Sequence, residues 1–217
     1  MSLIKKILVT TGLVFALGAC SSVPEQQTPQ NVGFLSDYSK LEYVDMGDDS
    51  VTWKYKSPID TSKYDSIIID EIDFYPTRPN DKQIPAKTLK DIKGFVGSNV
   101  YAIFSSQLKL TDDAGPNTAR LKLAITGLNV DDKELEFYEY IPIAFVINAF
   151  QGELNDMSVK IQIDAELIDS QTRDVISAFT KKDAGKVLEN DETPLSFKNL
   201  EPLLKKWLTS LDGVVNK

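Results

Sequence analysis

The only cysteine of this 217-residue chain, Cys20, directly follows an apolar leader, and this placement limits what the chain can fold into. Lys5 and Lys6 precede an apolar run at 7–17 that ends in small residues, the pattern of a cleaved secretory signal. A run of eleven residues is too short for a bilayer-spanning helix, which needs about 20 apolar residues. We therefore predict that residues 1–19 are a signal peptide and that the domain folds without a disulfide.

The four residues Leu17-Gly18-Ala19-Cys20 resemble the lipobox of bacterial lipoproteins. This resemblance implies that the Cys20 sulfur receives a diacylglyceryl group, that the leader is cut before Cys20, and that the new amine is acylated, for example with palmitate. Ser21 follows where aspartate would favour the inner membrane, so the resemblance implies an outer-membrane anchor with the domain in the periplasm. The alternative is an ordinary cleaved signal with a cysteine there by chance.

Composition excludes several kinds of chemistry. Without Lys5 and Lys6 the chain keeps 22 of its 24 basic residues against 32 acidic ones, a net charge of about −10, which argues against a nucleic-acid partner. The chain has no histidine, and lipidation would consume its thiol, so His-dependent triads and the usual zinc sites are excluded. We predict no catalytic residues, no metal and no cofactor, and we do not expect an enzyme.

Alternating apolar residues predict a half-buried strand at 159–167, in which Ile161 and Ile163 face the core while Lys160 and Gln162 do not. Further strands are predicted at 51–56, 64–75, 121–126 and 175–182. We expect 51–56 at an edge of the sheet and 64–75, with its three consecutive isoleucines, at the centre. A hairpin loop is expected at 169–174.

Helices are predicted at 85–110 and 201–213 from apolar spacings of three and four, and a third from near Pro142 within the apolar run 141–150. Together these elements predict an α+β fold: a mixed twisted sheet of about five strands, with helices packed on at least one face. We expect residues 20–33 to be the lipidated cysteine and a flexible tether, and 34–217 to be one globular domain, with a parallel strand pair across the first helix.

Two apolar segments are candidates for a partner contact. Phe34, Tyr38 and Leu41 have the spacing that places three side chains on one side of a short helical segment. This segment either docks the start of the chain onto the domain, which we favour, or presents aromatic anchors to a partner. The run 141–150 is either buried completely or exposes one side, including Phe145 and Phe150, to a partner or a lipid.

Gly33-Phe34-Leu35, followed by Asp37-Tyr38 and Leu41 just after the lipobox, resembles a family of uncharacterised bacterial lipoproteins that is known only as a domain of unknown function. The resemblance continues at 64–70, 114–118, 140–143 and 169–172. Arg173 departs from it, because glycine is expected after the threonine, so the hairpin turn must use a residue less tolerant of positive φ. This family implies a location and no established activity.

Acidic clusters are the remaining candidates for chemistry. The run 131–139 holds five carboxylates that could serve glycoside hydrolysis, but sequence spacing does not show a facing pair, and a solvated acidic surface is the simpler interpretation. Asp45, Asp48 and Asp49, and likewise Asp112 and Asp113, do not match a calcium loop.

The pattern as a whole favours a binding or adaptor lipoprotein of the cell envelope with an unidentified envelope protein as partner. The alternatives are a lipid or small-molecule carrier and, less favoured, a carboxylate-dependent cell-wall hydrolase.

Overall fold

The structure is a computed structural model that describes residue 29 and residues 31–46, 50–56, 61–76, 83–129, 158–188 and 193–215. The strands are β1 (Leu41–Val44), β2 (Val51–Tyr55), β3 (Ser66–Ile69), β4 (Asp73–Phe74), β5 (Lys109–Leu110), β6 (Thr118–Asn129), β7 (Ser158–Asp169) and β8 (Val175–Val187). The helices are the short 3-10 helix η2 (Tyr38–Lys40) and two long α-helices, α1 (Ala86–Ser105) and α3 (Phe197–Val215). Within these residues, neither α-helix is long and apolar enough to cross a membrane.

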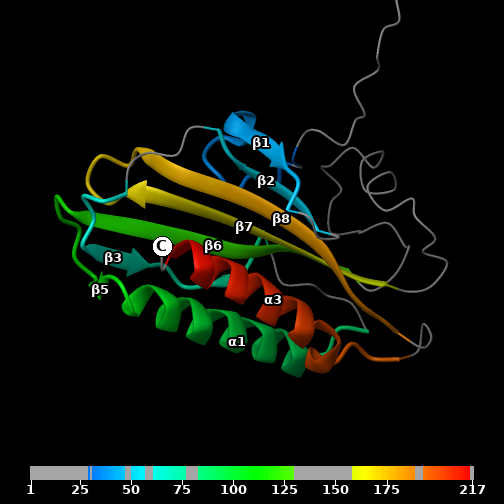
Figure 1. The fold of residues 1–217 in the computed structure, drawn as a ribbon. Helices are drawn as coiled ribbons and strands as arrows, with labels where there is room; N and C mark the ends of the chain where they lie inside the picture. Colours follow the sequence, from blue (N-terminus) through cyan, green and yellow to red (C-terminus); the bar gives the residue numbers. More distant parts are fainter. Residues whose placement is uncertain are drawn as a thin grey trace, which may run out of the picture.

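The described strands form one mixed sheet of eight strands in the order β1-β2-β8-β7-β6-β3-β5, with β4 also paired to β6 (Figure 1). The predicted parallel pair across the first helix is confirmed, because β3 lies parallel to both β5 and β6. The α+β class fits, but the expectation of about five strands is too low. The single strand predicted at 64–75 is divided into β3 and β4. The missed strands β1 and β5 contain four and two residues, too few for an alternating pattern to stand out.

Two strand positions differ from those expected. The isoleucine run forms β3, which lies next to the edge, whereas the long strand β7 occupies the centre. Three consecutive isoleucines indicate burial, and α1 supplies that burial beside the edge, since Ile67 and Ile69 belong to the core that α1 shares. The strand predicted at the edge, 51–56, is β2, and it lies one strand in from the edge because β1 pairs with its outer side.

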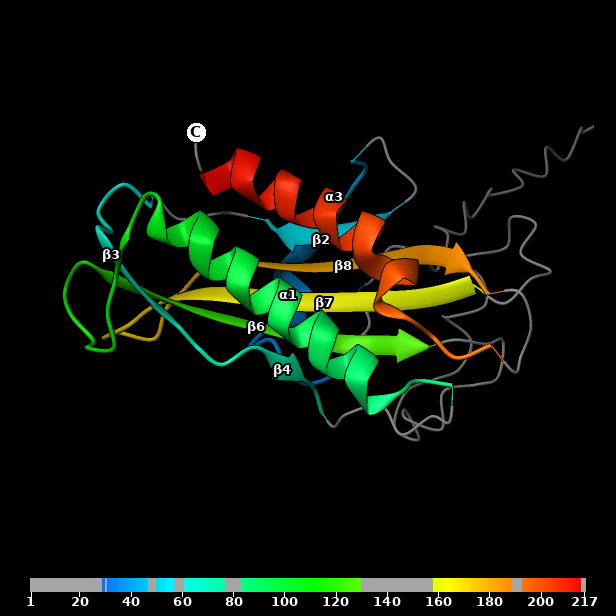
Figure 2. The ribbon, with the colours of Figure 1, turned by 90° about the horizontal axis from the view of Figure 1, so that it is seen from below.

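Both α-helices cover one face of the sheet (Figure 2). The helix predicted at 85–110 is confirmed as α1, but it ends at Ser105, and residues 109–110 form β5. The helix predicted at 201–213 is α3, which begins four residues before Glu201 and continues past Gly213. The extra turn at the start is stabilised by Asn199, whose side-chain oxygen accepts hydrogen bonds from the backbone N–H and the hydroxyl of Ser196. It also buries Leu200 completely. Pro202 therefore lies inside the helix and does not open it.

The prediction that Ile161 and Ile163 face the core is confirmed, because both are buried in the main core under the helices. The predicted alternation therefore holds, but the polar side of the strand is not open to water as a half-buried strand would be: Gln162 is 5% exposed, Asp164 0% and Glu166 1%. These polar side chains point to the opposite face, and the N-terminal part of the domain covers them. Burial on both faces follows from that cover, which the alternation in β7 alone does not reveal.

The cover is residues 33–40, which we call the strap. The predicted helical segment is reduced to the three residues of η2, after which the chain enters β1 at Leu41. The strap and β1–β2 share a second hydrophobic cluster that is separate from the main core and consists of Leu35, Tyr38, Leu41, Trp53 and Ala178. The domain thus has a large core under its helices and a small one under the strap.

Candidate functional site

The strap is bonded to the central strand through two carboxylates of β7. The Tyr38 hydroxyl donates a 2.6 Å hydrogen bond to Oδ2 of Asp164. The backbone N–H and the hydroxyl of Ser36 each donate a 2.9 Å bond to the carboxylate of Glu166. Because residues two apart on a strand point to the same side, Asp164 and Glu166 form adjacent acceptors for one passing segment.

Basic and amide groups complete this polar face. Lys122 on β6 places Nζ 3.3 Å from the Glu166 carboxylate. Gln162 donates from Nε2 to Oδ1 of Asp164 at 3.0 Å. On β8, Nζ of Lys182 lies 5.7 Å from the centre of the Trp53 ring. Three neighbouring strands therefore contribute charged or polar groups to the face of the sheet on which the strap lies.

Burial dominates the electrostatics of this face. It raises the pKa of the Asp164 carboxyl, against the opposing effect of hydrogen bonds from Tyr38 and Gln162. Burial also lowers the pKa of Lys182 to about 8, against the attraction of Asp164. The pKa of Tyr38 is raised, first by burial and then by the Asp164 charge. Hydrogen bonds and charge interactions link these groups to one another. The bonds to Ser36 and Tyr38 occupy the carboxylates of Glu166 and Asp164, which a hydrolase would need open to a substrate.

The first of the two predicted partner segments lies in the strap and at the start of β1. Tyr38 and Leu41 are buried in the second cluster. Phe34 is half-buried, with its ring edge-to-face against Tyr75 at 5.3 Å and Nζ of Lys122 5.6 Å from its centre. The structure thus places this segment against the domain.

The other predicted site residues, Cys20, Phe145 and Phe150, and the acidic run 131–139 lie outside the described residues. The sequence reasoning missed Ser36, Asp164 and Glu166. Their only signal is the alternation in β7, in which polar residues opposite isoleucines have the appearance of a solvent-facing side.

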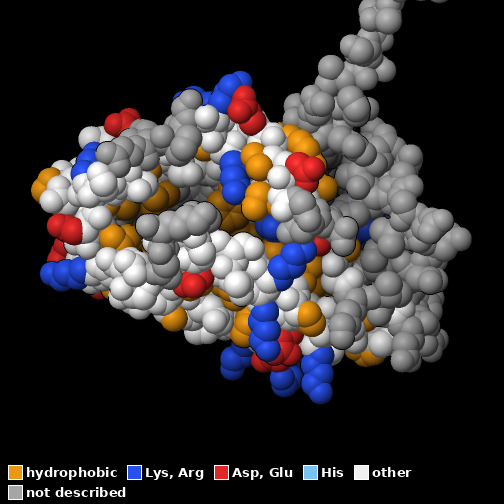
Figure 3. Space-filling model, in the orientation of Figure 1, with side chains coloured by type: hydrophobic (Ala, Val, Ile, Leu, Met, Phe, Trp, Pro, Cys, Tyr) orange, Lys and Arg blue, Asp and Glu red, His pale blue; other side chains and the backbone are white. Residues whose placement is uncertain are grey.

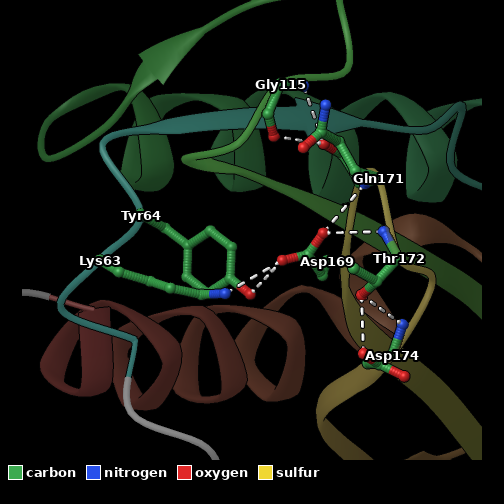
Figure 4. A network of polar contacts seen from close by, with 8 residues as sticks. Lys63, Tyr64, Gly115, Asp169, Gln171, Thr172 and Asp174 are labelled. Atoms are coloured by element: carbon green, nitrogen blue, oxygen red, sulfur yellow. Dashed lines mark hydrogen bonds and ion pairs between the residues drawn. The ribbon is translucent and has the colours of Figure 1, made fainter.

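A second polar network closes the end of the sheet at the β7–β8 hairpin (Figure 4). The Asp169 carboxylate accepts hydrogen bonds from the backbone N–H groups of Gln171 and Thr172, each at 3.0 Å. It also accepts a 2.9 Å bond from the Tyr64 hydroxyl and lies 3.1 Å from Nζ of Lys63. These donors, the Thr172 N–H foremost, hold the pKa of Asp169 well below its usual range.

This network joins segments that are distant in the sequence. Ser170, next to Asp169, accepts a hydrogen bond from the Gly115 N–H and donates one to the Gly115 carbonyl, each at 3.1 Å. Three stretches that carry the family resemblance, 64–70, 114–118 and 169–172, therefore meet at one end of the sheet. The turn itself uses Arg173 with φ 70°, which confirms the expected positive φ at a residue other than glycine. The bonds in this network hold the turn and join it to the segments before β3 and β6.

The surface offers two features that could receive a partner. Tyr43 and Met46, at and just after the edge strand β1, are 49% and 37% exposed. Figure 3 shows a hollow with a hydrophobic floor, above the C-terminal half of α3 in this view. Among the described residues, no group of three or more acidic or cysteine side chains could hold a metal ion.

Comparison with known proteins gives a family and several distant relatives. The model of the family described as a protein of unknown function (DUF3313) matches residues 30–211. The uncharacterized lipoprotein YdcL of Escherichia coli (strain K12) is 29% identical over 207 residues, which cover 94% of this chain and 92% of YdcL.

Among solved structures, the hypothetical protein CT253 from Chlamydia trachomatis has a TM-score of 0.42 and 10% identity, covering 70% of this chain and 98% of its own. Protein XCC0632 from Xanthomonas campestris has a TM-score of 0.40 and 12% identity, covering 70% and 86%. Likeness at this level says nothing about what the present chain binds.

Proposed function

This chain belongs to the DUF3313 family of proteins of unknown function, and from that premise we propose that it is an outer-membrane lipoprotein with a periplasm-facing binding domain. The lipobox-like residues ending in Cys20 support the anchor. So does the relative YdcL, which is named as a lipoprotein and aligns with this chain over 92% of its own length. The domain acts as an adaptor that holds another envelope protein near the membrane.

The observation that carries this proposal is the strap. It begins thirteen residues after Cys20 and is bonded directly to the central strand through Ser36 and Tyr38. The twelve residues between Cys20 and Gly33 span at most about 40 Å when extended. A lipid at Cys20 would thus hold a folded domain at a limited distance from the membrane, which suits a protein that positions a partner.

The edge of the sheet is the surface proposed for that partner. In the described part of the chain β1 pairs only with β2, so its outer side can accept an extended strand. Tyr43 offers an exposed ring there, stacked edge-to-face on Trp53 at 6.5 Å. Phe145 and Phe150 remain proposed as a second contact, on 141–150.

Photo-crosslinking in intact cells tests the proposal. A photoreactive residue in place of Tyr43 is expected to capture one envelope protein. The same residue in place of Tyr101 is the matched control, because Tyr101 is 42% exposed but lies on α1. Cys20→Ala should release the protein from the membrane fraction and reduce the adduct at position 43. Equal labelling at positions 43 and 101, or no defined adduct at either, would contradict a partner at β1.

A carrier of lipids or small apolar molecules is the second candidate, favoured by the hydrophobic hollow in Figure 3. The two functions differ in what is purified with the protein. A carrier extracted from membranes should hold a non-covalent lipid in native mass spectrometry, in addition to the covalent lipid at Cys20. A binding domain should show the covalent lipid alone.

A further inference from the structure

We propose that the strap, residues 33–40, is a releasable segment whose undocking lengthens the connection between the membrane anchor and the domain. It undocks while the main core stays folded. The proposal goes beyond the binding role and rests on the proposed anchor at Cys20 for its consequence, although not for the undocking itself.

The first step of the argument is that the strap is outside the main core. None of its residues belongs to the large cluster under α1 and α3. Leu35 and Tyr38 are buried only in the small cluster with Leu41, Trp53 and Ala178. Since proteins open in cooperative units that share a packed cluster, the strap can leave without loss of the contacts that hold the helices to the sheet.

The second step is that much of the face beneath the strap is suited to water. Asp164, Glu166 and Lys182 are ionisable groups whose burial is costly. When the strap leaves, water can hydrate the carboxylates of Asp164 and Glu166, and that gain offsets part of the lost bonds to Ser36 and Tyr38. A strap seated on an entirely apolar face would gain nothing of this kind on release.

The third step concerns length. With the strap docked, the chain from Ser21 to Val32 is the connection, twelve residues that reach about 40 Å. With the strap released, the connection extends to Lys40, which makes twenty residues and roughly 65–70 Å. The domain would then have two ranges of distance from the membrane. The docked strap sets the shorter range, and release of the strap, for example when a bound partner pulls on the domain, sets the longer one.

Hydrogen exchange of the full mature chain in detergent, read by mass spectrometry, tests the undocking. The backbone N–H of Ser36, bonded to Glu166, reports the strap, and that of Ile163 at the centre of β7 reports the main core. We expect the strap to exchange at least about 100-fold faster than β7, with a smaller dependence on added urea than β7 shows. Ser36→Ala should raise strap exchange about 10-fold or more and leave β7 unchanged.

Ser98→Ala is the matched control, because Ser98 is also an exposed serine but bonds the Gly94 carbonyl within α1. It should leave strap exchange unchanged. Exchange of the strap and β7 at one rate with one urea dependence would overturn the proposal, because the strap would then open only in global unfolding. If the mature chain proves to carry no lipid at Cys20 and the strap still exchanges faster than β7, the anchor is contradicted and the undocking stands.

Discussion

The hydroxyl of Tyr38 is the most direct means of weakening the strap without changing its shape. Tyr38→Phe keeps the buried ring but removes the 2.6 Å bond to Asp164. It also removes the acceptor of the Leu35 backbone N–H, which lies 3.3 Å from the hydroxyl oxygen. The substitution therefore leaves a buried carboxylate with one donor fewer and a backbone donor without its partner.

The expected magnitude follows from the charge of the acceptor. A hydrogen bond to a charged group contributes about 1.5–3 kcal/mol, so the docking of the strap should weaken by about that amount. The hydroxyl no longer matters once the strap has left. The loss in global stability is therefore limited by the free energy of strap docking, and we expect global unfolding to shift less than local opening.

Tryptophan fluorescence separates the two events, because the chain has two tryptophans, one in each cluster. A Trp207→Phe background leaves Trp53 as the reporter of the strap, while circular dichroism reports the helices. In urea the Trp53 signal should change before the helix signal. Tyr38→Phe should move the Trp53 transition to lower urea and move the helix transition less.

Tyr101→Phe is the matched control, since its hydroxyl donates to the Ile69 carbonyl at 3.1 Å and has no part in the strap. It should leave the Trp53 transition in place relative to the helix signal. The reasoning is refuted if both signals coincide in the parent background and Tyr38→Phe shifts them equally.

Three further predictions concern packing and pH. Ile163→Ala should lower the free energy of unfolding by about 2–5 kcal/mol in calorimetry through a cavity in the main core, more than Gln162→Ala; the reverse order would contradict the register of β7. Because the folded-state pKa of Asp169 is depressed, its stabilisation is present above the unfolded pKa of about 3.9 and is lost as pH falls below it. Thermal melts should show that loss in the parent chain and less of it in Asp169→Asn; equal acid sensitivity would contradict the network. The folded-state pKa of Lys182 is about 8, below its unfolded value of about 10.4, so this residue should add stability as pH rises from 8 toward 10. Urea titrations should show that gain in the parent chain and not in Lys182→Met. An equal gain in both chains would count against burial of the amine.

The sequence predicted the parts of the fold that depend on one long periodic pattern. The spacing in α1 and the alternation in β7 each extend over many residues, so both the element and its buried apolar side could be recognised. The hairpin between β7 and β8 was predictable for the same reason, and the departure at Arg173 identified the residue with positive φ. Local patterns of this length are sufficient to define secondary structure.

The strap site could not be predicted, because it depends on contacts between residues far apart in the chain. Ser36 and Glu166 are 130 positions apart, and Tyr38 and Asp164 are 126 apart. Nothing within β7 distinguishes a polar side covered by another segment from one that faces water. The order of the strands depends on the same long-range pairings, which is why the isoleucine run was expected at the centre and lies near the edge.

The membrane anchor is the central claim, and the intact mass of the protein extracted from bacterial membranes tests it most directly. The account predicts a mature chain that begins at Cys20 and carries a thioether-linked diacylglyceryl group and an acylated amine. A chain that keeps residues 1–19, or one cut at the leader with an unmodified Cys20, would contradict the anchor.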